Sequence, residues 1–170
     1  VLKNAGFFLV SIDDLAQNHF VSDIVLNQNI GAENIFEYSC EPYTELLLGI
    51  KYVLLRREFR ETNSWERKCN EQCNNILLTM GGSDENNTTS KILRIFERFD
   101  TRKLQITVVL GPGFVHKASI DEIAKNSFHS IKICVHVENM VPIIKNTDLA
   151  ISAPGSTVWE LLKLGTPSVL

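Results

Sequence analysis

The sequence has 170 residues, of which 44% are hydrophobic and 22% are charged, and its formal net charge is −3. This is enough apolar material for the core of one domain, or of one domain with part of another, and it excludes a disordered or fibrous protein. The acidic balance and the scattered Lys and Arg residues exclude the basic surface that nucleic-acid binding requires. We therefore expect a small-molecule ligand and no nucleic-acid partner.

Targeting and metal signals are absent from the sequence. No apolar run approaches the ~18 residues that a membrane helix needs, and the first residues, VLKNAGFFLVSIDD, lack the cleavage region of a signal peptide. The sequence therefore predicts a cytoplasmic protein without a membrane span, and we expect a monomer. The four cysteines form no Cys-x-x-Cys pair and the four histidines lie in unrelated contexts, so we expect no metal site and no cofactor.

Three short apolar runs in the first third of the chain predict strands, the first of them buried: FFLVSI at 7–12, DIVL at 23–26 and YVLL at 52–55. We interpret residues 1–57 as the C-terminal remnant of an N-terminal α/β domain. Residues 58–75 are rich in charged and amide side chains, and we expect them to form a linker. Because the first and last residues both have strand-like patterns, we expect the chain to be a fragment of a longer protein.

From residue 76 onward, strand-like and helix-like patterns alternate regularly. The strands are predicted at 76–80, 104–110, 131–135, 148–152 and from 168, and the helices at about 88–99, 118–126, 139–146 and 157–164. The buried stripe of the first helix is predicted at Ile92, Ile95, Phe96 and Phe99. Strands rich in Val, Ile and Leu are typical of a parallel sheet covered on both faces. We therefore predict a doubly wound, Rossmann-like α/β domain over 76–170, truncated at its C-terminus, with a ligand at the carboxyl ends of its strands.

Three loops follow strands of this predicted domain and should meet at one edge of the sheet. They are Gly81-Gly82-Ser83-Asp84 with Asn87, the stretch Asn139-Met140-Val141-Pro142, and the stretch from Ser152 to Thr157. Glycine turns and helix N-termini present backbone N–H groups, which attract phosphate. For the first loop, a phosphate cradle and a plain glycine turn are equally open. Asp84 would repel phosphate, so we expect it to cap a turn.

Glu160 has two alternative roles. The stretch Thr157-Val158-Trp159-Glu160 has the pattern of a capping box, in which the glutamate closes the first turn of a helix. The same carboxylate can instead accept hydrogen bonds from two ribose hydroxyls. The pattern alone favours the capping role.

Four segments, in order along the chain, carry a resemblance to a known family: SIDDLAQNHFVSDIVLNQN at 11–29, GIKYVLLRREF at 49–59, ILLTMGGSDENNTT at 76–89 and VENMVPIIKNTDLAISAPGSTVWELLKLGTPS at 137–168. They resemble the UDP-2,4-diacetamido-2,4,6-trideoxy-β-L-altropyranose hydrolases of the pseudaminic acid pathway and the related spore-coat polysaccharide proteins. The resemblance extends to the two-Rossmann-domain glycosyltransferases that make the peptidoglycan lipid intermediate. It implies a glycosyltransferase-B-type fold and a fragment of a UDP-sugar hydrolase. A UDP-sugar glycosyltransferase and a non-catalytic nucleotide-binding module are the alternatives.

The resemblance also implies which residues contact the substrate. The diphosphate would lie at the two glycine loops, the ribose at Glu160, the uracil beside the segment 137–140, and the sugar near the Lys51-Tyr52 pair. The implied substrate-binding residues are Tyr52, Gly82, Ser83, Asn87, Met140, Gly155, Ser156, Thr157 and Glu160. The resemblance thus makes ribose recognition the favoured role of Glu160. Capping of the helix remains compatible with it as a second role.

Two features depart from the family pattern. Pro154 stands before Gly155 where the family usually has a second glycine, which removes one N–H group from the loop. The family's Gly-x-Gly-His-x-x-Arg loop, which carries the histidine associated with catalysis, has no counterpart in this sequence. The catalytic residue is therefore unknown, and we expect it in a preceding N-terminal segment.

Overall fold

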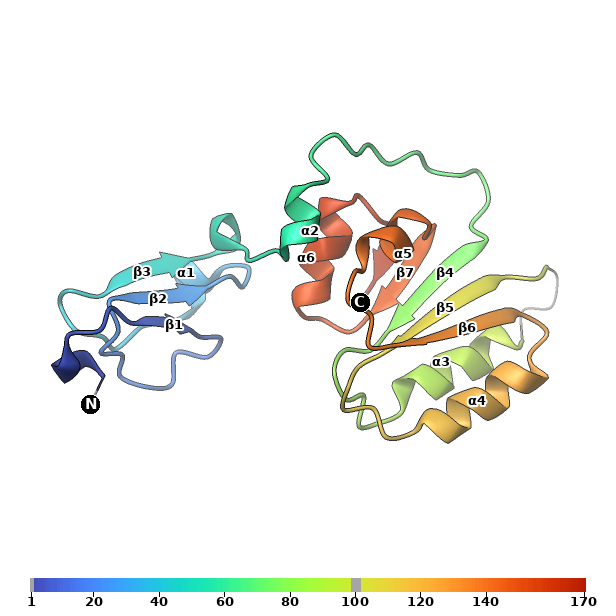
Figure 1. Ribbon diagram of the computed structural model, residues 1–170, viewed down its shortest axis with the longest axis horizontal. Coiled ribbons are helices and arrows are strands. Elements are labelled where there is room, and N and C mark those ends of the chain that lie inside the picture. The colour runs from blue at the N-terminus through green and yellow to red at the C-terminus, as the bar shows by residue number, and fades with distance from the viewer. Residues whose placement is uncertain (1, 99–101) are drawn as a thin grey trace. The chain divides into compact units, whose positions relative to one another are not determined.

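A computed structural model describes residues 2–98 and 102–170 (Figure 1). The chain divides between Leu54 and Leu55 into two compact units, and each unit is described by itself. Both units contain a parallel sheet, so the predicted α/β class is confirmed.

The first unit is built on a three-stranded parallel sheet. Its strands are, in spatial order, β1 (Val10–Ile12), β2 (Ile24–Asn27) and β3 (Glu45–Leu48), and its short helices are η1 (Lys3–Ala5), α1 (Ala32–Ile35) and η2 (Ile50–Tyr52). Val25 and Leu26 in the central strand are buried, whereas Val10 and Ile12 in β1 are 56% and 66% exposed. The first apolar run therefore forms a strand, but not the buried strand that we predicted. Among the described residues, β1 is an edge strand and pairs with β2 alone.

The prediction of a strand at 52–55 is wrong. The third strand of this unit, β3, is formed by the apolar residues that precede this stretch. The run ELLLGIKYVLL contains two apolar stretches, and only the first pairs with β2. Gly49 separates them with a φ of +91°, and a Cβ at this position would lie 2.5 Å from a carboxylate oxygen of Glu33. The chain leaves the sheet at this glycine and turns into η2.

The second unit contains a five-stranded parallel sheet with strand order β6-β5-β4-β7-β8. The strands are β4 (Asn75–Thr79), β5 (Gln105–Leu110), β6 (Ser130–Val135), β7 (Leu149–Ser152) and β8 (Ser168–Val169). The helices are α2 (Arg57–Arg60), α3 (Thr88–Phe96), α4 (Lys117–Asn126), α5 (Val141–Lys145) and α6 (Ser156–Lys163). The doubly wound topology predicted for 76–170 is confirmed, with small shifts at the element ends.

Both faces of this sheet are covered by helices. In β4, Ile76 and Leu78 pack in one hydrophobic cluster with Leu93 of α3, while Leu77 packs in a second cluster with Leu161 of α6. Figure 1 shows the corresponding layers, with α3 and α4 on one face and α2, α5 and α6 on the other. This double coverage explains why the strand sequence is continuously apolar instead of alternating.

The buried side of α3 differs from the predicted stripe. Ile92 and Phe96 pack against the core as predicted, but Ile95 is 51% exposed and Phe99 lies outside the described residues. Leu93 is fully buried instead. The inward side also carries a serine, whose hydroxyl hydrogen-bonds to a serine of α4. The apolar spacing therefore predicted the helix but not which of its sides is buried.

The segment expected to be a linker, 58–75, packs on the second unit. Phe59 is completely buried among α5 and α6 residues, and Trp65 Nε1 donates to the Leu164 carbonyl at 3.3 Å. The Arg67 side chain donates to the carbonyls of Ile144, Lys145, Thr147 and Leu164 and to the hydroxyl of Thr166. These acceptors lie at the C-terminal ends of α5 and α6, where backbone carbonyls lack helical partners.

Replacing Arg67 with Ala should destabilise the protein by about 2 to 3 kcal/mol, because several part-buried carbonyls lose a charged donor. Urea unfolding at neutral pH measures the change. The exposed neighbour Lys68 is the control, and Lys68→Ala should stay within about 0.5 kcal/mol of the wild type. Equal effects of the two substitutions would show that Arg67 does not hold the helix ends.

Candidate functional site

The strand order creates a topological switch point between β4 and β7. After β4 the chain continues through α3 to β5 on one side, and after β6 it returns through α5 to β7 on the other side. The loops after β4 and β7 begin side by side, since Thr79 pairs with Ser152 and Ala153 N donates to Thr79 O at 3.1 Å. Ligands of open α/β sheets bind outside the carboxyl ends of the strands at such a point.

The loop after β4 rests on the loop after β5. Gly113 N donates to Gly82 O at 2.9 Å. A Cβ added to Gly111 would lie 2.5 Å from Gly81 O and closer still to Gly82 O. Both carbonyls therefore point toward the β5 loop, and because the described peptides are trans, the N–H groups of Gly82 and Ser83 point away from it.

Asp84 caps helix α3. Its carboxylate accepts hydrogen bonds from Thr88 N at 2.8 Å and from the backbone N and hydroxyl of Thr89 at 2.8 and 2.7 Å. Burial raises the pKa of this carboxyl, but the hydrogen bonds outweigh burial and hold the pKa below its usual value. The expected capping role is confirmed, and a carboxylate already occupies the N-terminus of α3.

Within the described part of the chain, the N-terminus of α6 has no side-chain cap. The helix begins at Ser156 with Gly155 as the N-cap residue, and its first backbone hydrogen bond runs from Val158 N to Gly155 O. Gly155 and Ser156 are exposed. The first N–H groups of a helix have no partner within the helix, and together with the helix dipole they attract anions. Pro154 precedes this group and contributes no donor.

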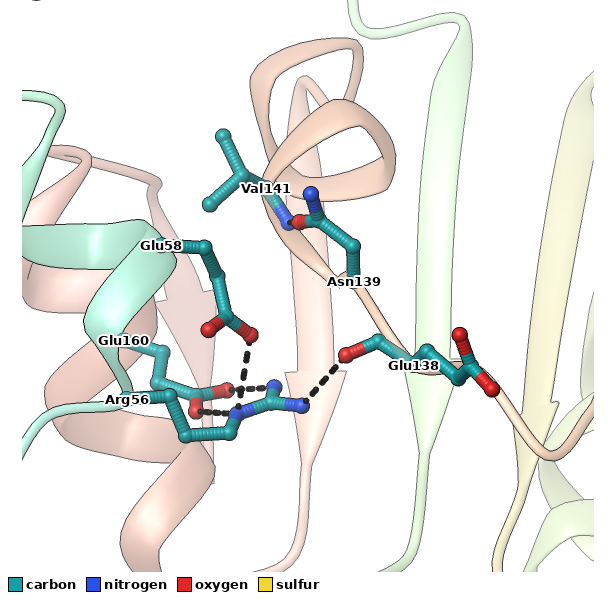
Figure 2. A network of polar contacts seen from close by, with 6 residues as sticks. All are labelled: Arg56, Glu58, Glu138, Asn139, Val141 and Glu160. Carbon is teal, nitrogen blue, oxygen red and sulfur yellow. Dashed lines mark hydrogen bonds and ion pairs between the residues drawn. The ribbon is translucent and has the colours of Figure 1, made fainter.

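Glu160 does not close a capping box, so the capping role suggested by the pattern is wrong. Because α6 begins at Ser156, Glu160 is already its fifth residue and lies beyond the uncapped end. Its carboxylate, which is 9% exposed, accepts Arg56 Nε at 2.7 Å and Arg56 Nη2 at 3.0 Å (Figure 2). The carboxylate thus belongs to an ion pair on the flank of the helix, in the second unit.

Arg56 also joins Glu160 to the loop that precedes α5. Its Nη1 donates to Glu138 O at 3.2 Å, and its Nε lies 3.4 Å from Glu58 Oε1. The second contact is an ion pair only, since that Glu58 oxygen has no hydrogen bond within the described part of the chain. The hydrogen bond to Glu160 raises the pKa of Arg56, so the guanidinium stays charged. The network places the segment 137–140 next to Glu160.

The side chains of two further predicted residues, Met140 and Asn87, are not gathered at this edge, and a third, Tyr52, belongs to the other unit. Met140 is 5% exposed and packs in the core, which leaves only its backbone available to a ligand. Asn87 Nδ2 donates to Ser119 Oγ at 3.1 Å, so its side chain lies between α3 and α4. Tyr52 belongs to the first unit, where the Lys51 ammonium lies 4.8 Å from the centre of its ring.

Arg56 is the residue of this network that the sequence did not reveal. It precedes Glu160 by 104 positions in a charged stretch, RREFRE, where nothing separates it from its neighbours. Arg57, next to it, is 88% exposed and pairs with Glu61 at the surface. A weak indication in the sequence is the position of Arg56, which is the first charged residue after the apolar stretch YVLL.

Within residues 2–98 and 102–170, no group of three or more His, Cys, Asp or Glu side chains is arranged to hold a metal ion. His129 is buried, with Nδ1 accepting Leu104 N and Nε2 donating to Phe96 O, which is a structural role. No helix in the same ranges is long and apolar enough to cross a membrane.

Comparison with protein families gives a match to the glycosyltransferase family 28 C-terminal domain over residues 76–170, more than half of the chain. The chain belongs to this family. The family 28 domain thus starts with β4 and contains both glycine loops and Glu160. Arg56, which holds Glu160, lies before the matched region.

Several curated proteins are similar to this family 28 chain. The uncharacterized protein MJ1062 of Methanocaldococcus jannaschii is 37% identical over 155 residues, which cover 88% of this chain and 32% of that protein. The spore coat polysaccharide biosynthesis protein SpsG of Bacillus subtilis is 24% identical over 150 residues, with 88% and 43% covered. The UDP-N-acetylglucosamine–N-acetylmuramyl-(pentapeptide) pyrophosphoryl-undecaprenol N-acetylglucosamine transferase of Leuconostoc citreum is 25% identical over 118 residues, with 66% and 32% covered.

These matches confirm the resemblance to spore-coat polysaccharide proteins and to glycosyltransferases at the level of the family. The chain spans 32% to 43% of the length of the curated relatives that it matches.

Replacing Gly111 with Ala should destabilise the domain by about 2 kcal/mol or more, because the new methyl group would overlap two backbone oxygens that cannot move independently. Gly82→Ala is the matched control for stability, since a Cβ at Gly82 meets nothing within 4 Å. Thermal and urea unfolding of both variants measure the difference. If Gly111→Ala is as stable as Gly82→Ala, the two loops are not in the contact described.

The Asp84 cap should make stability depend on pH in acid. Since the folded pKa is lowered from 3.8, the contribution is complete above about pH 4 to 5 and is lost as pH falls through the folded pKa. We expect Asp84→Asn to cost about 1 to 2 kcal/mol at pH 7 and less at pH 3. Urea unfolding at both pH values measures this. The exposed neighbour Glu85 is the control, and a pH-independent difference between wild type and Asp84→Asn would contradict the cap.

Proposed function

We propose that this family 28 domain binds a UDP-sugar at the carboxyl edge of its sheet, as part of an enzyme that releases UDP from it. The proposal rests on the arrangement of α6. Its uncapped N-terminus offers donors, and Glu160, whose Cα lies roughly 6 Å further along the helix axis, offers carboxylate acceptors. A nucleoside diphosphate carries matching groups in the same order, phosphates followed by a ribose diol.

The diphosphate is proposed to lie at the start of α6. The N–H groups of Ser156 and Thr157 are the first donors of the helix, and the helix dipole favours an anion there by ~0.3 to 1 kcal/mol per charge. The N–H groups of Gly82 and Ser83 point away from the β5 loop and provide a second set of donors. The α3 N-terminus is not part of the proposal, because Asp84 occupies it.

The ribose and base are proposed to follow along the flank of α6. Both Glu160 oxygens are hydrogen-bond acceptors, and a vicinal diol offers two donors. The segment 137–140 lies next to Glu160 through the Arg56 network. Its backbone, ordered by the hydrogen bond from Val141 N to Asn139 Oδ1 at 2.9 Å, is the proposed surface for a uracil ring.

The proposed reaction is hydrolysis of a UDP-sugar, with a diacetamido-trideoxy sugar of the pseudaminic acid or a related surface-polysaccharide pathway as the expected substrate. Water attacks the anomeric carbon, the bond from this carbon to the diphosphate oxygen breaks, and UDP leaves with the bonding electrons. Donors at the start of α6 stabilise the charge that develops on the diphosphate. The proposed base is a histidine in a Gly-x-Gly-His-x-x-Arg loop, which this sequence does not contain. We therefore expect this chain alone to be inactive.

A glycosyltransferase is the second candidate, and the Leuconostoc citreum relative, named as a transferase, favours it. In that reaction an acceptor hydroxyl replaces water, while the nucleotide site is unchanged. A non-catalytic nucleotide-binding module would use the same site without either step. The three functions share UDP binding, so binding is the property to test first.

The chain should bind UDP about tenfold more tightly than ADP or GDP, a difference of ~1.4 kcal/mol. The physical reason is that the backbone of 137–140 is proposed to fit a pyrimidine. Titration calorimetry with the three diphosphates at matched salt measures the affinities. Purine diphosphates binding equally well would contradict the UDP assignment, and absence of binding by all three would contradict the nucleotide site.

Glu160→Gln connects this binding to the proposed site. An amide has a single acceptor oxygen and no charge, so the affinity for UDP should fall by ~1.5 to 3 kcal/mol. Glu71→Gln is the matched control, because the Glu71 side chain is exposed and lies outside the proposed site. Urea unfolding of both variants verifies that they are folded during the titration. UDP affinity that survives Glu160→Gln would limit Glu160 to a partner of Arg56.

A further inference from the structure

Arg56 contacts both oxygens of Glu160 without using up their hydrogen-bonding capacity. The Nε and Nη2 atoms approach Oε1 and Oε2 side by side, at 2.7 and 3.0 Å (Figure 2). A carboxylate oxygen has two lone pairs, so each oxygen of Glu160 retains one acceptor position. The two remaining positions point to opposite sides of the carboxylate, so a ribose hydroxyl can bind at one of them while the ion pair stays intact.

The geometry of this pair sets the plane of the carboxylate. A glutamate side chain has several rotatable bonds, whereas a guanidinium fork binds both oxygens in one plane. The third donor of Arg56, Nη1, holds the carbonyl of Glu138. One side chain therefore sets both the orientation of Glu160 and its distance from the segment 137–140.

The charges around Arg56 favour hydroxyl groups over phosphate. Glu160 and Glu58 both lie within ion-pair distance of the single guanidinium, so the cluster of three side chains carries a net negative charge. Three nitrogens of the guanidinium already face protein oxygens. A phosphate placed here would meet two carboxylates, whereas the start of α6 offers uncompensated donors.

Building on the proposed function, we propose that Arg56 is a positioning residue for ribose recognition. It holds the Glu160 carboxylate so that one oxygen faces the ribose 2′ hydroxyl, and it holds the base-binding segment at the matching distance. Arg56 itself does not touch the ligand. Discrimination between ribose and 2′-deoxyribose therefore depends on a residue outside the matched family 28 region.

The test compares UDP with 2′-deoxy-UDP on the full chain by calorimetry. Wild type should prefer UDP, and Arg56→Gln should lower UDP affinity about tenfold and bring the UDP to 2′-deoxy-UDP ratio close to one. Arg56→Lys keeps the charge but cannot bind two oxygens in one plane, so the ratio should also narrow. Arg57→Gln, at an exposed neighbour on α2, should leave affinity and ratio unchanged. If Arg56→Gln fails to fold, Arg56→Lys carries the test.

A double-substitution cycle shows whether Arg56 acts through Glu160. In the Glu160→Gln background, Arg56→Gln should change UDP affinity by less than about threefold, because the group that it positions is gone. A tenfold loss of UDP affinity in the Glu160→Gln background would mean that Arg56 contacts the ligand directly, and it would overturn the inference. An unchanged ratio of UDP to 2′-deoxy-UDP affinity in the single variant Arg56→Gln, or tighter UDP binding by that variant, would also overturn it. If the wild type binds no UDP, both the proposed function and the inference are contradicted. If it binds UDP and the Arg56 variants keep the wild-type ratio of UDP to 2′-deoxy-UDP affinity, only the inference is contradicted.

Discussion

The ion pair between Arg56 and Glu160 joins residues 104 positions apart and organises one side of the second unit. Glu160 is nearly buried, and an unpaired carboxylate there would carry a large desolvation cost. The same arginine begins the short turn that places Phe59 in the core, and its guanidinium lies 5.6 Å from the Phe59 ring centre. The loop before α5 is attached through the Glu138 carbonyl. Packing of α2, orientation of Glu160 and placement of that loop therefore depend on a common contact.

The other side of the candidate site depends on backbone packing instead of charge. The loop after β4 is supported by the loop after β5 at a distance that only glycine allows at position 111. This support turns the carbonyls of Gly81 and Gly82 toward the loop after β5, so the N–H groups that follow them point away from that loop. The site thus combines two kinds of groups at one edge: backbone donors at the glycine loops and at α6, and carboxylate acceptors on the flank of α6.

Local sequence patterns predicted the order of strands and helices in the second unit well. They did not predict most of the contacts between individual side chains. The order of strands and helices from β4 to β8 was predicted because strands covered on both faces have continuous apolar sequences. The third strand of the first unit was misplaced, because ELLL and YVLL are equally apolar and only pairing with β2 distinguishes them. The capping box was also wrong. Its sequence fits, but α6 starts at Ser156 and Glu160 finds a stronger partner in Arg56.

By itself, the sequence determined the α/β class, the parallel order of elements, the edge of the sheet where loops gather, and the capping role of Asp84. These properties depend on periodicity and on residues a few positions apart, which a linear sequence displays. Only the tertiary structure decided that Arg56 holds Glu160, that Gly111 supports the first loop, and that Arg67 closes the ends of α5 and α6. Those contacts join residues about 30 to 100 positions apart. At such separations the partner is chosen by packing of the sheet and its helices, because many charged or small residues have the same local pattern.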